Sequence, residues 1–140
     1  MYETDPFGKR AAIKRPALGY FKHEAVAVDV DRGQLYLTED EKDGCLYPFT
    51  PSHPLPDLSA GVLEVAVVDY AQRVSWQVID EPTPGKNEGA TRTRHQVKAA
   101  TRFKGGEGIC YQRGLIIFST KRDNRIWVLD IASQAISVLY

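Results

Sequence analysis

The sequence contains few cysteines, and neither is placed for an obvious metal or disulfide role. Cys45 and Cys110 are the two cysteines among 140 residues. Neither belongs to a CxxC pair, and neither has a histidine nearby at the spacing of a zinc site. Because free cysteine is among the most buried residue types, we expect both to be core thiols, with a disulfide or ligand pair as the alternative. Cysteine usage therefore assigns no cellular compartment.

The sequence also lacks long hydrophobic runs and an excess of either charge. The runs Gly61–Val68 and Gly114–Phe118 are far shorter than the roughly 18 apolar residues that a membrane span needs. Lys and Arg number 18, and Asp and Glu also number 18, so no overall field attracts nucleic acid or an anionic membrane. Residues 1–15 carry charges of both signs and no apolar stretch, which as they stand do not make a secretory signal. We expect a soluble single domain over residues 1–140, with no membrane or nucleic-acid partner.

Several common catalytic motifs are missing as well. His23 and Glu24 begin a stretch like HExxH, but no second histidine follows four residues after the first, which excludes a zincin helix. The sequence contains no GxxxxGK[ST] and no GxSxG, so a phosphate-binding P-loop and a nucleophile elbow are also excluded.

What the sequence does contain is a series of short strand-like segments. They are rich in β-branched and aromatic residues and are separated by turn clusters such as Asp31–Gly33, where Gly33 is expected to supply a positive φ. The segments are residues 24–29, 34–40, 45–49, 61–69, 73–80, 108–112, 115–121, 125–131 and 135–140. Residues 81–104 between them read as a polar linker with one short helix at about 93–103. The pattern predicts an all-β fold of antiparallel strands.

Some of these segments are apolar at consecutive positions. Ala25–Val28 and Ile126–Leu129 present no polar face to water, which is typical of strands that are covered on both sides. Because no crossover helices stand between the segments, we expect sheets stacked face to face.

Two parts of the chain repeat the same order of residues. In each, a glutamate precedes a strand of small apolar residues, a glycine turn follows, the next strand ends near a threonine, and an aspartate precedes a further apolar strand. The matching pairs are Glu24 and Glu107, Gly33 and Gly114, Thr38 and Thr120, and Asp43 and Asp123.

Such repetition, with about four short antiparallel strands a unit, is the signature of β-propeller blades. The two glutamates are 83 positions apart, which corresponds to two blades or to one blade with an insertion. A complete ring does not fit into 140 residues, so we predict a partial β-propeller of about two to three blades. Its blade-like units are expected at about residues 20–80 and 105–140, with the linker and short helix at about 81–104.

In a propeller, the first residues of each innermost strand meet at one rim of the central channel. Carboxylates brought together there raise one another's pKa unless a cation neutralises them, and hard divalent cations prefer oxygen ligands. Glu24 and Glu107 are therefore candidate metal ligands. The alternative is that both are solvated charges at loop ends.

Basic residues gather just ahead of the second glutamate. The run from Thr91 to Lys104 contains Arg94, Lys98 and Arg102 at helical spacing, and it is suited to collecting an anion such as phosphate. A solvated helix face is the alternative interpretation.

Four stretches together resemble the PhoX-type alkaline phosphatases and their uncharacterised relatives. They are ETDPFGKRAAIKRPALGYFKHEAVAVD, LYLTEDEKDGCLYPF, RFKGGEGICY and STKRDNRIWVLD, and they preserve motif order over nearly the whole chain. The resemblance implies a six-bladed β-propeller that hydrolyses phosphate monoesters with a cluster of calcium and iron ions at the channel mouth. It also implies export by the twin-arginine route, and hence a periplasmic location if the full-length gene follows the family.

The resemblance assigns roles to individual residues. Glu24 of the KHE motif and Glu107 of the GEG motif correspond to carboxylate ligands of the metal cluster. The family's phosphate-contacting arginine falls at Gly105, so Arg102 or Lys104 is left to reach the same space, and a lysine does not copy the two-pronged contact of an arginine. Neither Cys45 nor Cys110 matches the family's iron-binding cysteine.

Two functions follow as hypotheses. The first is a partial-length PhoX-like phosphatase that supplies part of the metal site. The second is a propeller segment without catalysis that serves as a binding or scaffold module. In either case a partial propeller leaves blade faces uncovered, so we also expect self-association or packing against missing blades.

Overall fold

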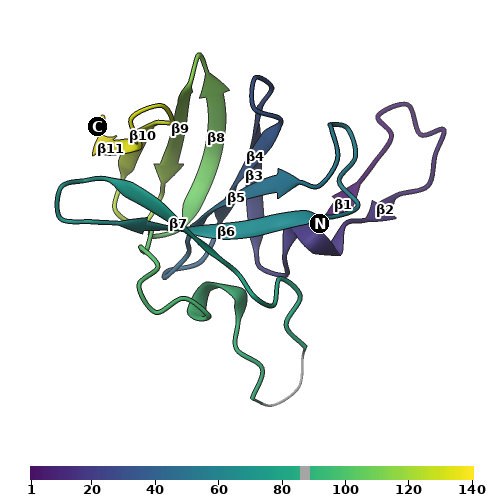
Figure 1. Cartoon of the computed structure of the whole chain (residues 1–140), viewed down its shortest axis with the longest axis horizontal. Helices are drawn as coiled ribbons and strands as arrows, with labels where there is room; N and C mark the ends of the chain where they lie inside the picture. Colours follow the sequence, from purple (N-terminus) through teal and green to yellow (C-terminus); the bar gives the residue numbers. More distant parts are fainter. Residues whose placement is uncertain (86–88) are drawn as a thin grey trace.

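The protein is described from a computed structural model that covers residues 1–85 and 89–140 (Figure 1). Each strand pairs with its neighbour in the chain in antiparallel fashion, so each sheet is a simple meander. A two-stranded sheet contains β1 (Tyr2–Glu3) and β2 (Ile13–Lys14). The five-stranded sheet contains β3 (His23–Asp29), β4 (Gln34–Glu39), β5 (Leu46–Pro51), β6 (Gly61–Val68) and β7 (Val74–Val78). The four-stranded sheet contains β8 (Gly106–Gln112), β9 (Leu115–Thr120), β10 (Arg125–Asp130) and β11 (Ala135–Val138).

The prediction of an all-β fold with antiparallel strands is confirmed, and each predicted strand segment contains a strand. The predicted turn at Asp31–Gly33 is also confirmed, because Gly33 has φ 66°. Asp29 stabilises this turn, since its Oδ1 accepts hydrogen bonds from the backbone amides of Asp31 and Arg32, both at 3.1 Å. The Asp29 carboxylate thus supplies hydrogen-bond acceptors for turn amides that have no backbone partner in the sheet.

The first strands of the two larger sheets lie side by side in the same direction. Near the start of both, the Thr38 hydroxyl donates to the carbonyl of Glu107 at 2.7 Å, and beyond the other end of β3 the Tyr111 hydroxyl donates to Asp31. The outer ends of the sheets also meet, where the amide of Val74 donates to the carbonyl of Gln134 at 2.8 Å. The sheets therefore contact each other from their first strands to their last.

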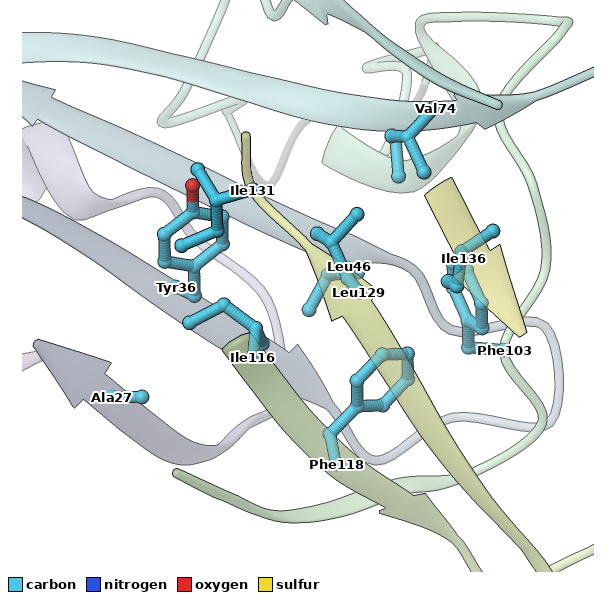
Figure 2. Packing of buried hydrophobic residues seen from close by; sticks show 11 residues of the cluster. Ala27, Tyr36, Leu46, Val74, Phe103, Ile116, Phe118, Leu129, Ile131 and Ile136 are labelled. Carbon is cyan, nitrogen blue, oxygen red and sulfur yellow. The ribbon is translucent and has the colours of Figure 1, made fainter. Parts of the chain in front are cut away.

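The main hydrophobic core fills the space between these two sheets (Figure 2). Every strand from β3 to β7 contributes to it, while Phe103 of the linker and strands β9 to β11 contribute from the other side. Phe103 packs edge to face on Phe118 and on Trp127, with ring centroids 5.1 Å and 5.3 Å apart. The buried members are Ala27, Tyr36, Leu46, Ala66, Val74, Phe103, Ile116, Phe118, Leu129, Ile131 and Ile136.

A second core covers the opposite face of the five-stranded sheet. Buried side chains of β4, β5 and β6 pack there against Leu18, which follows β2 in the 3-10 turn η1 (Pro16–Leu18), and against Ala17 and Phe21. Figure 1 shows the β1–β2 hairpin on this side, away from β8–β11. The N-terminal segment therefore covers this face of the five-stranded sheet, while self-association or packing against further blades stays a prediction.

Other expectations from the sequence need correction. Val26 and Val28 are 43% and 39% exposed and Ile126 is 36% exposed, so these two strands are not covered on both sides. The short helix expected near 93–103 is present, but within this range it is limited to the three-residue 3-10 helix η2 (Thr93–His95). Cys45 is buried as expected, whereas Cys110 is exposed, because it faces away from the core on β8. The number of blades and the division into units at 20–80 and 105–140 stay predictions.

We expect Phe103→Ala to lower the free energy of unfolding by about 3–5 kcal/mol, because it leaves a cavity between the two sheets. Urea unfolding followed by tryptophan fluorescence measures the change. Tyr70→Ala is the matched control, because Tyr70 is 99% exposed. Equal effects of the two substitutions would contradict the role of Phe103 in joining the sheets.

Candidate functional site

Glu24 and Glu107 occupy equivalent positions in the fold. Each lies in a β-bulge, because the register shifts between His23 and Val26 on β3 and between Gly106 and Ile109 on β8. Bulges re-aim side chains and are common beside functional sites. The sequence repeat therefore corresponds to a repeated backbone irregularity at the start of both first strands.

One hydroxyl group connects the two bulges. The amide of Ala25 donates to Thr38 Oγ1 at 3.2 Å, and the same hydroxyl donates to the carbonyl of Glu107 at 2.7 Å. Thr38 is 1% exposed, so water does not compete for these bonds. The backbones at Glu24 and Glu107 are thus held at one common rim of the two sheets.

The side chains of the two glutamates differ in their surroundings. Glu24 is exposed, whereas Glu107 Oε1 lies 2.6 Å from the ammonium nitrogen of Lys121. The same nitrogen lies 2.7 Å from Asp40 Oδ1, and Lys22 lies 2.7 Å from Asp40 Oδ2. Hydrogen bonds from Lys121 and Lys22 hold the pKa of Asp40 below its usual range, so Asp40 is ionised at neutral pH.

A buried ion pair lies next to this rim. Glu39 is fully buried and accepts hydrogen bonds from Arg94 Nη1 at 2.8 Å, the Tyr47 hydroxyl at 2.8 Å and the Cys45 amide at 3.2 Å. Burial raises the pKa of Glu39, and the Tyr47 and Arg94 donors oppose that rise. Arg94 also reaches Asp43, with Nε 3.0 Å from Oδ1. Arg94 therefore fastens the linker to the β4–β5 turn instead of forming a solvated helix face.

The two basic residues predicted to bind phosphate lie in different environments. Arg102 Nη1 donates to the carbonyl of Arg94 at 2.6 Å and lies 3.0 Å from the thiol sulfur of Cys45, so it braces the same buried cluster. Lys104 is exposed. Their binding of phosphate stays a prediction.

Gly105 has a backbone that disfavours the arginine expected from the family pattern. Its φ is 71°, and a Cβ atom there would lie 3.0 Å from Arg122 Cγ and 3.1 Å from Lys121 Cγ. Its amide donates to the carbonyl of Glu41 at 2.8 Å, which ties the start of β8 to the β4–β5 turn. A side chain at this position would therefore be strained as well as crowded.

An open cleft of about 640 Å³ lies between the segment that leads into β3 and the linker. Phe21 and Lys22 contribute from the first side, and Arg92 and Arg94 from the other, together with Glu41. Because Lys22 and Arg94 are paired with carboxylates, exposed Arg92 presents a cation that is better placed to meet an anion from solvent.

The described residues do not fit a metal-ion site as they are arranged. Within residues 1–85 and 89–140, no three His, Cys, Asp or Glu side chains gather closely enough to hold a metal ion. Glu107 and Asp40 share the ammonium of Lys121, which takes the place that a metal ion would have between them.

Within the described residues, no helix is long and apolar enough to span a membrane.

Comparison with known proteins identifies the family. A family model described as alkaline phosphatase PhoX matches residues 1–134. The chain belongs to the PhoX alkaline phosphatase family. The resemblance inferred from the sequence is thereby confirmed. No curated protein matches the chain.

A solved structure shares the PhoX-like fold of this chain. It is described as Pseudomonas fluorescens PhoX in complex with vanadate, a transition state analogue, and it matches with a TM-score of 0.71 and 21% identity. The match covers 96% of this chain and 34% of that one, so the chain spans about a third of the length of that PhoX structure. At this identity the likeness shows the fold alone.

We expect Arg94→Met to lower the free energy of unfolding by about 3–5 kcal/mol, because it leaves the Glu39 carboxylate buried without its cation. Adding Glu39→Gln to Arg94→Met should restore part of the loss. Urea unfolding measures each variant, with Arg92→Met as the exposed control. An equal loss of unfolding free energy in Arg92→Met and Arg94→Met would contradict the stabilising role of the buried ion pair.

Asp43 makes stability depend on pH at the acid end. Burial acts to raise its pKa, but hydrogen bonds from His95 and Arg94 outweigh this and lower the pKa to about 2. A depressed folded-state pKa stabilises the protein above the ordinary value of 3.8, and the contribution is lost as the pH falls toward 2. We expect Asp43→Asn to cost about 1 kcal/mol at pH 6, after allowing for solvent screening, and to flatten the loss of stability between pH 4 and 2. Denaturant unfolding across this pH range tests the prediction, with exposed Asp80→Asn as the control. If the free energy of unfolding of Asp43→Asn falls with pH as steeply as that of the unmodified chain, the prediction is contradicted.

Proposed function

We propose that this chain forms part of a PhoX-type phosphatase site for phosphate monoesters. The observation that carries the proposal is the pair of matched bulges, which brings the backbones of Glu24 and Glu107 to one rim through the Thr38 hydroxyl. Membership of the alkaline phosphatase PhoX family supports the proposal that the reaction takes place at this rim. The arrangement of the sheets as blades of a propeller belongs to the same proposal.

The chain's own residues would bind and orient the substrate. Lys22 and Lys121 at the rim are paired with Asp40 and Glu107, whereas exposed Arg92 puts a positive charge in the cleft beside the rim, which favours a phosphoryl group over a neutral ligand. Lys104 is also exposed, and it lies three residues before Glu107 in the chain. Glu24 and Glu107 are the carboxylates that we assign to metal ligation in the complete protein.

Calcium and iron are the proposed cofactors of the complete protein, where they would neutralise the charge on the phosphoryl oxygens. The described residues hold an ammonium between Asp40 and Glu107 instead of a completed ligand set. We therefore assign no chemical step to a metal ion on this chain. The proposal extends to export of the complete protein to the periplasm, as in its family.

A second function is a binding or scaffold module without catalysis. The Lys121 ion pair favours it, because Glu107 is already neutralised in the described structure. Metal-independent folding without turnover of phosphate esters would support this module.

We expect the complete protein, supplied with calcium and iron, to hydrolyse p-nitrophenyl phosphate, and Glu107→Gln to lower the rate at least about tenfold by removing a carboxylate from the rim. Release of p-nitrophenol measures the rate. Glu81→Gln is the matched control, because Glu81 is exposed and lies in the linker. Absence of turnover, or equal rates in both variants, would overturn the phosphatase proposal in favour of the scaffold module.

A further inference from the structure

The ammonium of Lys121 lies between two carboxylates from different parts of the chain. Its nitrogen is 2.7 Å from Asp40 Oδ1 and 2.6 Å from Glu107 Oε1. Asp40 directly follows β4 of the five-stranded sheet, whereas Glu107 on β8 and Lys121 after β9 belong to the four-stranded sheet. The lysine therefore joins the two sheets at the rim that carries both bulges.

The two carboxylate oxygens require a cation at this place. Asp40 Oδ1 and Glu107 Oε1 are both shielded from solvent, and the ammonium faces each of them. Two ionised carboxylates directed at one point repel each other unless a positive charge neutralises them. Carboxylate oxygens are also among the ligands that calcium binds.

We propose that Lys121 is a built-in counterion that takes the place of a divalent cation between Asp40 and Glu107. A divalent cation binds Glu107 only when the ammonium withdraws, so Lys121 controls access of metal to this rim. The inference deepens the proposed function, because it concerns Glu107, but it makes a claim about cation binding and not about turnover.

The surroundings of Lys121 allow such an exchange. Its side chain is 46% exposed, while that of Asp40 is 9% exposed, so the cation is able to leave toward solvent and the carboxylate stays in place. A lysine carries its charge on a flexible four-carbon stem, which suits withdrawal better than a planar guanidinium does. Lys22 remains on the other oxygen of Asp40 and keeps that carboxylate oriented.

The test is the affinity for calcium alone, measured by isothermal titration calorimetry on the full chain. We expect Lys121→Met to bind calcium about tenfold or more tightly than the unmodified chain, because a competing positive charge is gone. Adding Glu107→Gln to Lys121→Met should remove that gain. Lys121→Arg should show no such gain in calcium affinity, since it keeps the competing charge.

Lys98→Met is the matched control, because it removes one exposed positive charge elsewhere. Equal calcium affinities of Lys121→Met and Lys98→Met would overturn the proposal. If Lys121→Met is unstable without metal, calcium should raise its melting temperature and leave that of Lys98→Met unchanged. A Lys121→Met chain that stays unfolded in millimolar calcium would also overturn it. None of these results depends on phosphatase activity, so failure of the proposed function and failure of this inference are distinguishable.

Discussion

The attachment of the linker to the β4–β5 turn is the constraint on which the rest of the structure depends. The buried Glu39 carboxylate holds Arg94, and farther along the linker the amides of Phe103 and Gly105 donate to the carbonyls of Gly44 and Glu41, both at 2.8 Å. These contacts fix where β8 begins. A buried ion pair adds little net stability compared with apolar packing, but it disfavours any other placement of the linker. The position of the second sheet, and hence of Glu107, follows from it.

The strands of the two larger sheets were predictable from sequence because their signal is local, whereas the short β1–β2 hairpin was not predicted. β-branched and aromatic runs separated by turn residues identify them without knowledge of their partners. The matched glutamates were found in the same way, and the structure adds the bulges that both occupy. The helix expected near residues 93–103 is shorter than its periodicity suggested, because burial of Arg94 and Phe103 determines the path of the linker, and this tertiary effect overrides helical periodicity.

The ionic partners at the rim were not predictable by the same means. Pairing of Asp40 with Lys121 depends on how two sheets pack, which no short window of sequence records. One signal was nevertheless available. In the repeat that matches Thr38 with Thr120, the next residues are Glu39 and Lys121, which have opposite charge. A reversal of charge within a repeat indicates that the two copies serve different partners, here Arg94 for Glu39 and Asp40 with Glu107 for Lys121.

The second hydrophobic core makes the outer faces of the two larger sheets unequal, because it covers only that of the five-stranded sheet. The N-terminal segment with Leu18 and Phe21 seals one flank of the five-stranded sheet, whereas the far side of β8–β11 leaves Cys110 and Ile126 in contact with water. If further layers pack against this protein, we therefore expect them to add to the β8–β11 side. Proteins that associate through one face form closed dimers, whereas proteins that associate through two opposite faces form fibres.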